Sequence, residues 1–380
     1  MIDSSGDVGW EWPRLHAAQR VVLLDVLIHG SRSRVELARR TGLSRATLMR
    51  LTRDLVELEF VTEGAALRST GRGRPSETVH IRPESAHFAG IKLTGETLYA
   101  VVTDLHANTV HTEEHALASR SVDDVVALIV ETAGRLSASH PRLAAIGICL
   151  AGDVRVVRGS ATVVGSHFLG WEDEVPLERL VAERSGLPTA ISNDVQALTL
   201  AHHWFGAGVG CRSLAVIGFG AGIGAGLVVG DELVRGAAGH PGKVGHLFVT
   251  DDGPGCDAGH PGCVSAFVTI PSVLRNAGVA DLDALRVAFL AREPRAVAAV
   301  EAAGRALGVV VATLRNVADV EKVVVTGEGL EIARWAHEQL LATVDERLDP
   351  AASDATLDLR DFAFADYAWA AAITAIHHVV

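Results

Sequence analysis

The chain has 380 residues, 48% of them hydrophobic, and a formal net charge of −12. Its length and apolar content allow two or three domains with sizeable cores, which excludes a disordered or fibrous protein. It has no uninterrupted run of about 18 apolar residues and no signal-peptide pattern at its N-terminus, so we expect a cytoplasmic protein. Its four cysteines do not form the pattern of a disulfide framework.

The charge is distributed unevenly along the chain. Residues 14–80 contain twelve arginines, no lysine and seven acidic residues, so their net charge is +5. The other 313 residues therefore carry −17, which together with +5 gives the total of −12. A basic module joined to an acidic body predicts that the N-terminal part binds a polyanion.

Apolar spacing in the basic part predicts three helices, over residues 14–30, 34–42 and 45–60. Ser44 caps the third helix, in which three leucines at i, i+3 and i+7 face the core and turn the arginines outward. Those leucines are Leu48, Leu51 and Leu55. Two helices joined by a short turn, the second rich in arginine, indicate a helix-turn-helix.

A two-stranded wing is predicted next, with strands at residues 60–62 and 78–81 and an arginine-rich loop between them. Arginines on such a loop can enter the minor groove of DNA. We therefore expect DNA binding, although three-helix units of this kind also mediate protein contacts. The expected DNA-binding residues are Ser44, Arg45, Thr47, Arg50, Arg53, Arg72 and Arg74.

The rest of the chain reads as two similar halves. After a linker at residues 82–85, three short strands are followed by a helix, a strand, a helix, a strand and a helix. At Ser213 the order starts again with a glycine-rich hairpin, and a long helix and a buried strand follow. This predicts a duplicated α/β fold of two lobes that binds ligands in the cleft between them.

Two glycine-rich segments lie in the second half. Residues 218–226 contain a dinucleotide-type spacing, but a strand follows where a helix would be needed, which leaves phosphate contact or close strand packing as interpretations. Residues 240–263 gather histidines and two cysteines, which is compatible with a metal site and with an exposed loop of free cysteines.

A resemblance to the ROK family, the bacterial sugar-responsive repressors and sugar kinases, rests on these segments together: AIGICLAGDV, FLGWEDEVPL, SNDVQAL, GFGAGIGAG, GHPGKVGH and VVVTGEGL. It spans the chain from Phe88 to the C-terminus, and the preceding winged helix-turn-helix is similar to the family's repressor branch. The resemblance implies an actin-like, hexokinase-type body. We expect domains over residues 14–82, 87–208 and 209–380, with the C-terminal helix returning to the first lobe.

The kinase branch of the family carries an Asp-x-Gly-x-Thr phosphate loop at the start of this body. Here the matching positions hold Lys92, Thr94 and Glu96. A lysine cannot ligate a metal ion, and a glutamate repels a triphosphate, so we expect no enzyme activity. Asp194 matches the family's catalytic base and is expected to bind a sugar hydroxyl with Asn193, while a helix cap is the structural alternative for this pair.

The family pattern also implies a structural zinc bound by one histidine and three cysteines. His246, Cys256 and Cys263 match three of these ligands, while Ala258 stands at the position of the middle cysteine. His260, Asp257 or water can supply the fourth ligand, or the metal is lost. The family's two sugar-binding glutamates are replaced by Lys243 and Ser265, which favours an anionic sugar derivative as ligand.

We therefore predict a DNA-binding transcriptional regulator, a repressor controlled by a sugar or sugar-derivative effector and acting as a homodimer or homotetramer on a palindromic operator. The alternatives are a sugar kinase of the same family and a DNA-binding protein controlled by metal or redox state. The expected effector-binding residues are His167, Asn193, Asp194, Lys243, His246 and Ser265.

Overall fold

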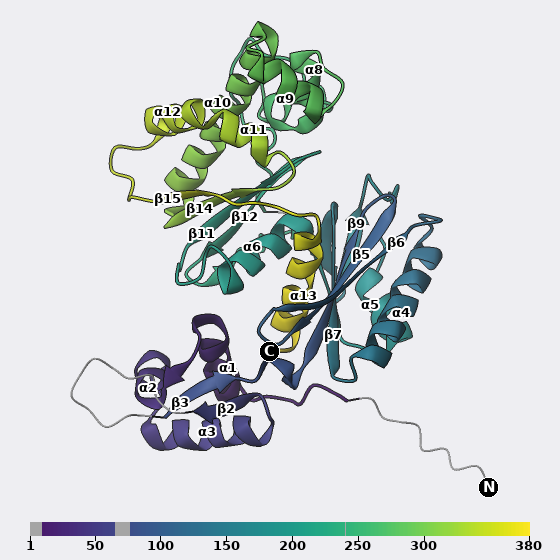
Figure 1. The fold of residues 1–380 in the computed structure, drawn as a ribbon, viewed down its shortest axis with the longest axis vertical. Coiled ribbons are helices and arrows are strands. Elements are labelled where there is room, and N and C mark those ends of the chain that lie inside the picture. The colour runs from purple at the N-terminus through teal and green to yellow at the C-terminus, as the bar shows by residue number, and fades with distance from the viewer. Residues whose placement is uncertain (1–9, 65–76, 240) are drawn as a thin grey trace. The chain divides into compact units, whose positions relative to one another are not determined.

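The structure is a computed structural model that describes residues 10–64, 77–239 and 241–380. The chain divides into two compact units. The first comprises residues 1–197 and 367–380, and the second comprises residues 198–366. Each unit contains one five-stranded sheet with helices packed on it (Figure 1).

The N-terminal domain has the predicted three helices and a small sheet of order β1-β3-β2. Ser33 and Ser44 cap the second and third helices through side-chain bonds to backbone amides, and the predicted leucine face of the third helix is buried. The elements are α1 (Ala17–His29), β1 (Arg32–Ser33), α2 (Arg34–Thr41), α3 (Arg45–Glu57), β2 (Val61–Gly64) and β3 (Thr78–Ile81).

The predicted wing strands pair antiparallel, with Val61 opposite Ile81. The loop between them, which carries Arg72 and Arg74, lies outside the described residues. The predicted linker contains a short 3-10 turn, η1 (Pro83–Ser85), in which Ser85 is buried. The described part of the domain is thus a winged helix-turn-helix followed directly by the body.

The sheet of the first unit has the order β10-β7-β4-β5-β6. Strands β4 and β7 are parallel neighbours at its centre, and helices cover both of its faces, which explains their nearly continuous apolar sequences. Helices α4 and α5 lie on one face and α13 lies on the other (Figure 1). The elements are β4 (His87–Leu93), β5 (Thr97–Asp104), β6 (Thr109–Ala116), α4 (Val122–Ser139), β7 (Leu143–Leu150), α5 (Leu177–Ser185), β10 (Thr189–Asn193) and α13 (Ala365–Val379).

Two glycines allow the C-terminal helix α13 to lie directly on this sheet. A Cβ atom on Gly90 would lie 1.9 Å from the carbonyl oxygen of Ala368, and one on Gly147 would lie 1.7 Å from that of Ala371. Both glycines face helix backbone, so no rotation of a side chain could make room. The last helix of the chain therefore completes the core of the first unit.

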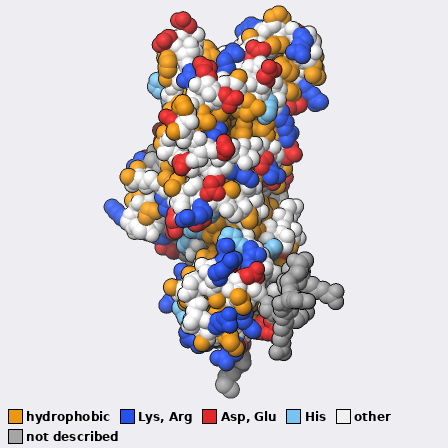
Figure 2. Space-filling view, turned by 90° about the vertical axis from the view of Figure 1, so that its left-hand side faces the viewer, with side chains coloured by type: hydrophobic (Ala, Val, Ile, Leu, Met, Phe, Trp, Pro, Cys, Tyr) orange, Lys and Arg blue, Asp and Glu red, His pale blue; other side chains and the backbone are white. Residues whose placement is uncertain are grey.

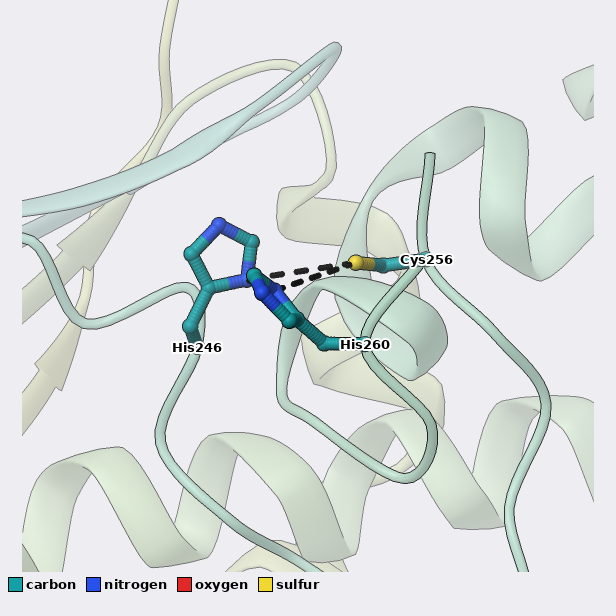
Figure 3. Close-up of side chains that lie close together, drawn as sticks. All are labelled: His246, Cys256 and His260. Atoms are coloured by element: carbon teal, nitrogen blue, oxygen red, sulfur yellow. Dashed lines mark hydrogen bonds between the residues drawn. The ribbon is translucent and has the colours of Figure 1, made fainter. Parts of the chain in front are cut away.

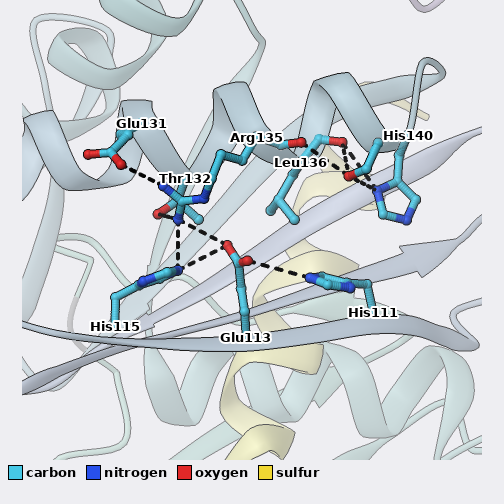
Figure 4. Close-up of polar contacts among 9 residues, drawn as sticks. His111, Glu113, His115, Glu131, Thr132, Arg135, Leu136 and His140 are labelled. Atoms are coloured by element: carbon cyan, nitrogen blue, oxygen red, sulfur yellow. Dashed lines mark hydrogen bonds and ion pairs between the residues drawn. The ribbon is translucent and has the colours of Figure 1, made fainter.

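Edge strand β6 is joined to helix α4 by a polar network (Figure 4). Glu113 accepts a hydrogen bond from Arg135 at 3.3 Å, and its carboxylate lies 3.1 Å from Nε2 of His115 and 3.5 Å from Nε2 of His111. Burial raises the pKa of Glu113, but hydrogen bonds from His115 and His111 outweigh it, so the pKa is lowered overall. The charged groups satisfy one another and also discourage pairing of another chain with this edge.

The sheet of the second unit has the order β13-β12-β11-β14-β15. As in the first unit, a meander of three strands is extended by two parallel strands beside its first strand. The predicted duplication is therefore confirmed. The strands are β11 (Leu214–Phe219), β12 (Ile223–Val229), β13 (Glu232–Leu233), β14 (Lys322–Thr326) and β15 (Thr356–Leu359).

Helix α10, the long helix that the sequence predicts in the second half, is the central helix of the second unit. It is long and apolar enough to cross a membrane, but 67% of its most apolar window is buried inside the fold, as in a core helix. The helices are α6 (Asp194–Phe205), α7 (Ser265–Val268), α8 (Ile270–Ala277), α9 (Leu282–Leu290), α10 (Pro294–Ala318), α11 (Leu330–Trp335) and α12 (His337–Arg347).

One hairpin of the body is absent from the sequence analysis. Strands β8 (Asp153–Val157) and β9 (Ser160–Gly165) form a separate two-stranded sheet between β7 and α5. They are joined at Arg158 and Gly159, which both have positive φ. Such a two-residue turn is a hairpin signal, but the strands are only partly buried and show no regular alternation.

Candidate DNA-binding, ligand-binding and metal-binding sites

Helix α3 presents an exposed, arginine-bearing face opposite its buried leucines. Arg45, Arg50 and Arg53 are exposed on it, and Met49 is 59% exposed between them. Among the described residues Arg45 and Arg50 have no acidic partner, whereas Arg53 lies 3.8 Å from Glu57. Figure 2 shows Lys and Arg side chains (blue) on the surface of the N-terminal domain, with hydrophobic side chains (orange) between them.

The other two predicted contacts on α3 lie at its start. Ser44 accepts a hydrogen bond from the amide of Thr47, and the two hydroxyl oxygens lie 2.9 Å apart. These side chains therefore stabilise the start of the helix, whose free amides favour an anion such as a phosphate. The contact of Arg45 and Arg50 with DNA bases stays a prediction.

Lys92, on β4, binds the carboxylate of Asp194 at the start of α6. Its Nζ atom lies 2.8 Å from Oδ2 of Asp194 and 4.4 Å from the ring centroid of Tyr367. Lys92 is 3% exposed and Asp194 is 8% exposed. The sequence analysis identified both residues but did not predict the pair. A lysine inside the apolar strand FAGIKL was the available signal, because a buried ammonium group requires a partner.

Asp194 also helps to cap helix α6, as the structural alternative proposed. The amide of Val195 donates to Oδ1 of Asp194 and to Oδ1 of Asn193, both at 2.9 Å. The amide nitrogen of Asn193 donates to the carbonyl oxygen of Gly152. Both oxygens of the Asp194 carboxylate thus accept a hydrogen bond within the protein, and the binding of a ligand hydroxyl by Asp194 stays a prediction.

The glycine-rich hairpin of the second unit turns tightly between β11 and β12. A Cβ atom on Gly220 would lie 2.1 Å from Oε2 of Glu328. The carboxylate of Glu328 thus lies directly against the turn that a phosphate would have to approach. A side chain at position 220 would displace the Glu328 carboxylate, so Gly220 permits this close packing, which was one of the two interpretations of the glycine array.

The metal-competent residues of the second unit converge in one place (Figure 3). The Nδ1 atoms of His246 and His260 lie 3.1 Å apart, and each lies 3.9 Å from the sulfur of Cys256. The sulfur of Cys263 lies 3.7 Å from Nδ1 of His246. His246, Cys256 and His260 could together hold a metal ion, and Cys263 lies beside His246. All four cysteines of the chain are free thiols, so no disulfide competes for the sulfur atoms.

The two thiols of this cluster differ electrostatically. Burial is the largest influence on Cys256 and raises its pKa, but backbone amides of His260 and Ala258 and the thiol of Cys263 outweigh it and lower the pKa overall. Burial raises the pKa of Cys263. Cys256 is therefore the thiol that more readily becomes the thiolate required of a metal ligand.

The remaining predicted residues lie around this cluster or elsewhere. The amide of Ser265 donates to the carbonyl oxygen of Gly245, next to His246, and Lys243 is exposed nearby in sequence. Asp257 lies outside the cluster because its carboxylate faces Arg275 at 3.4 Å. His167, in the first unit, is exposed beside the ring of Phe168.

Comparison with known families decides the identity of the body. The model of the ROK family matches residues 88–370. The chain belongs to the ROK family. The model of the IclR helix-turn-helix domain matches residues 21–64, in agreement with the winged helix-turn-helix described above.

Individual relatives place this ROK chain among regulators and kinases. It is 29% identical over 259 residues to a putative xylose repressor from Caldicellulosiruptor sp., a match that covers 67% of this chain and 64% of the relative. A ROK family transcriptional regulator, described as a homologue of the E. coli MLC protein, has the same fold, with a TM-score of 0.79 and 21% identity over 93% of this chain and 94% of that one. A ROK hexokinase from Thermus thermophilus matches with a TM-score of 0.68 and 26% identity over 77% and 99%.

Proposed function

We propose that this ROK chain is a DNA-binding transcriptional repressor of the cytoplasm. The observation that carries the proposal is the face of α3, where Arg45 and Arg50 are exposed and have no acidic partner in the described part of the chain, within a winged helix-turn-helix attached to a ROK body. Arginine forms bidentate hydrogen bonds with guanine in the major groove, so these two side chains read bases. Arg53, Arg72 and Arg74 contact phosphates or the minor groove, and Ser44 and Thr47 bring the helix start to the backbone.

The repressor acts as a homodimer or homotetramer, since two copies of α3 on a two-fold axis fit a palindromic operator. Selection of bound fragments from the genome of the source organism tests this function. We expect enrichment of a two-fold symmetric sequence whose half-sites lie about 10 base pairs apart or a multiple of this. Recovery of fragments without a shared sequence would contradict a specific operator.

The effector is a sugar or an anionic sugar derivative. Support comes from the xylose repressor among the relatives, from the acceptor capacity left on Asp194, and from a lysine at position 243 where the family pattern has an acid. Asn193 and His167 contribute further hydrogen-bonding groups, and Ser265 adds a hydroxyl group beside Gly245. Calorimetric titration with neutral sugars and with their phosphates tests this assignment. Tighter binding of the neutral sugars would disprove the anionic preference.

The alternative activity, sugar phosphorylation, is disfavoured by two positive features. Lys92 already neutralises Asp194, which a kinase would need as a free base, and Glu328 lies against the glycine turn at Gly220. A carboxylate at that turn repels a triphosphate. We therefore expect no ATP consumption over a panel of sugars, and turnover with any of them would establish an enzyme.

The His246, Cys256 and Cys263 cluster binds a structural zinc ion. Nδ1 of His246 lies 3.1 Å from Nδ1 of His260, 3.9 Å from the sulfur of Cys256 and 3.7 Å from the sulfur of Cys263, and these separations suit tetrahedral zinc coordination. When bound, zinc cross-links the ends of this loop, which has no regular secondary structure of its own. If the metal instead controls DNA binding, a chelator will abolish operator binding without unfolding the chain.

A further inference from the structure

His260 is held over Cys256 by the backbone of the loop. The amide of Cys256 donates to the carbonyl oxygen of His260 at 3.0 Å, and the amide of Gly259 donates to that of Cys256 at 2.8 Å. Gly259 and Gly262 have φ values of +83° and +61°, which permit the two reversals of the chain on either side of His260. The placement of the His260 ring thus follows from a closed turn.

Four of the separations among these donor atoms match the edges of a tetrahedral site with sulfur and nitrogen ligands. Zinc–nitrogen bonds of about 2.0 Å and zinc–sulfur bonds of about 2.3 Å imply N–N and S–N separations of about 3.3 and 3.5 Å in a tetrahedron. The His246–His260 Nδ1 separation is 3.1 Å, the Cys263–His246 S–N separation is 3.7 Å, and the two S–N separations from Cys256 are 3.9 Å. These differ from the ideal values by a few tenths of an ångström.

The two imidazole rings meet nitrogen to nitrogen (Figure 3). When both rings are neutral, only one of the two facing Nδ1 atoms can carry a proton, and when both rings are protonated the contact is repulsive. A metal cation between the rings can be bound by the lone pairs of both Nδ1 atoms at once. Asp257, the other candidate, is 81% exposed and faces Arg275, and Ala258 has no ligating atom.

We propose that His260 is the fourth ligand of the zinc site, so that Cys256, Cys263, His246 and His260 bind the ion together. This inference rests on the structural zinc proposed above. Two thiolates balance the charge of Zn²⁺, so the site as a whole is neutral, whereas three thiolates and one histidine would leave it at −1. With an imidazole in place of the family's third thiolate, the loop that carries Lys243 therefore has one negative charge fewer.

X-ray absorption at the zinc edge of the purified full chain tests the ligand set directly. We expect two sulfur and two nitrogen neighbours, at about 2.3 and 2.0 Å. His260→Ala should weaken zinc binding by roughly 10-fold or more in a chelator competition, because loss of a ligand costs at least as much as loss of a supporting residue. Asp257→Asn, which alters the neighbouring side chain, should bind zinc like the unmodified chain.

The double variant Ala258→Cys, His260→Ala tests whether a cysteine can restore the zinc binding that His260→Ala loses. A cysteine at position 258 restores the family's third thiolate, so the double variant should regain zinc and show three sulfur neighbours. Unchanged zinc affinity in His260→Ala, or a first shell with a single nitrogen in the unmodified chain, would overturn the role of His260 while leaving structural zinc intact. A chain that takes up no zinc even when it is supplied would overturn the structural zinc itself.

Discussion

The ammonium group of Lys92 lies 2.8 Å from the carboxylate of Asp194, although 102 positions separate the two residues in the chain. Both side chains are buried, and the ring of Tyr367 lies over the ammonium group. Asp194, which the sequence analysis matches to the family's catalytic base, thus has its charge compensated from within the protein. The pair gives a physical reason for the proposal that this body does not transfer a phosphoryl group.

Replacing Lys92 by methionine should strongly destabilise the first unit. The substitution retains most of the side-chain volume but leaves the buried Asp194 carboxylate without its counter-ion, which typically costs about 3–5 kcal/mol. Urea unfolding measures the loss. The double variant Lys92→Met, Asp194→Asn should recover much of it, because no buried charge remains. Arg305→Gln, which breaks an exposed pair with Glu301, should change stability by no more than about 0.5 kcal/mol.

Gly147→Ala should prevent α13 from docking on the first sheet. The new methyl group would overlap the carbonyl oxygen of Ala371, so the helix has to shift and the surrounding core loses contacts. We expect a loss of roughly 3 kcal/mol or more, or an insoluble chain. Gly134→Ala is the matched control, since nothing lies within 4 Å of a Cβ atom there and the site is inside α4. It should stabilise the chain by about 0.5–1 kcal/mol in thermal unfolding.

His202, on α6, should make the stability depend on pH. Burial lowers its pKa to about 4, with a smaller contribution in the same direction from Arg360. Because the unfolded chain takes up a proton near pH 6.5 and the folded chain does not, stability should fall as the pH drops from about 6.5 to about 4 and then level off for this group. When the pH is lowered from 7 to 5, the free energy of unfolding of His202→Leu should fall by about 2 kcal/mol less than that of the unmodified chain. Equal losses in both chains would show that His202 protonates freely when folded.

The repeated pattern of strands made much of the fold predictable from the sequence. The helix-turn-helix was visible because capping serines, leucine spacing and arginine charge coincide within a short segment, and the two lobes were visible because the strand meander recurs. Hairpin β8–β9 was missed because its strands are short and half exposed. The docking of α13 was only partly predictable, since the glycines that permit it lie in β4 and β7, more than 200 residues before the helix.

The sites were predictable as sets of residues but not as pairs. Lys92 and Asp194 were each singled out by comparison with the family, yet only the fold shows that one neutralises the other. Likewise the sequence left His260 and Asp257 as equal candidates beside the cysteines. The two residues differ in their surroundings. Backbone hydrogen bonds hold His260 beside Cys256, whereas Asp257 pairs with Arg275, on α8.

Operator binding by variants of α3 tests the central claim most directly. The measurement is fluorescence anisotropy of a labelled duplex recovered by genomic selection, titrated with the full chain at fixed salt. Arg45→Ala and Arg50→Ala should each weaken binding by about 1–3 kcal/mol and relax the preference at one base position. Arg184→Ala, an exposed arginine on α5, should bind the duplex normally. Unchanged affinity in both α3 variants would contradict the assignment of this helix as the part of the protein that reads DNA.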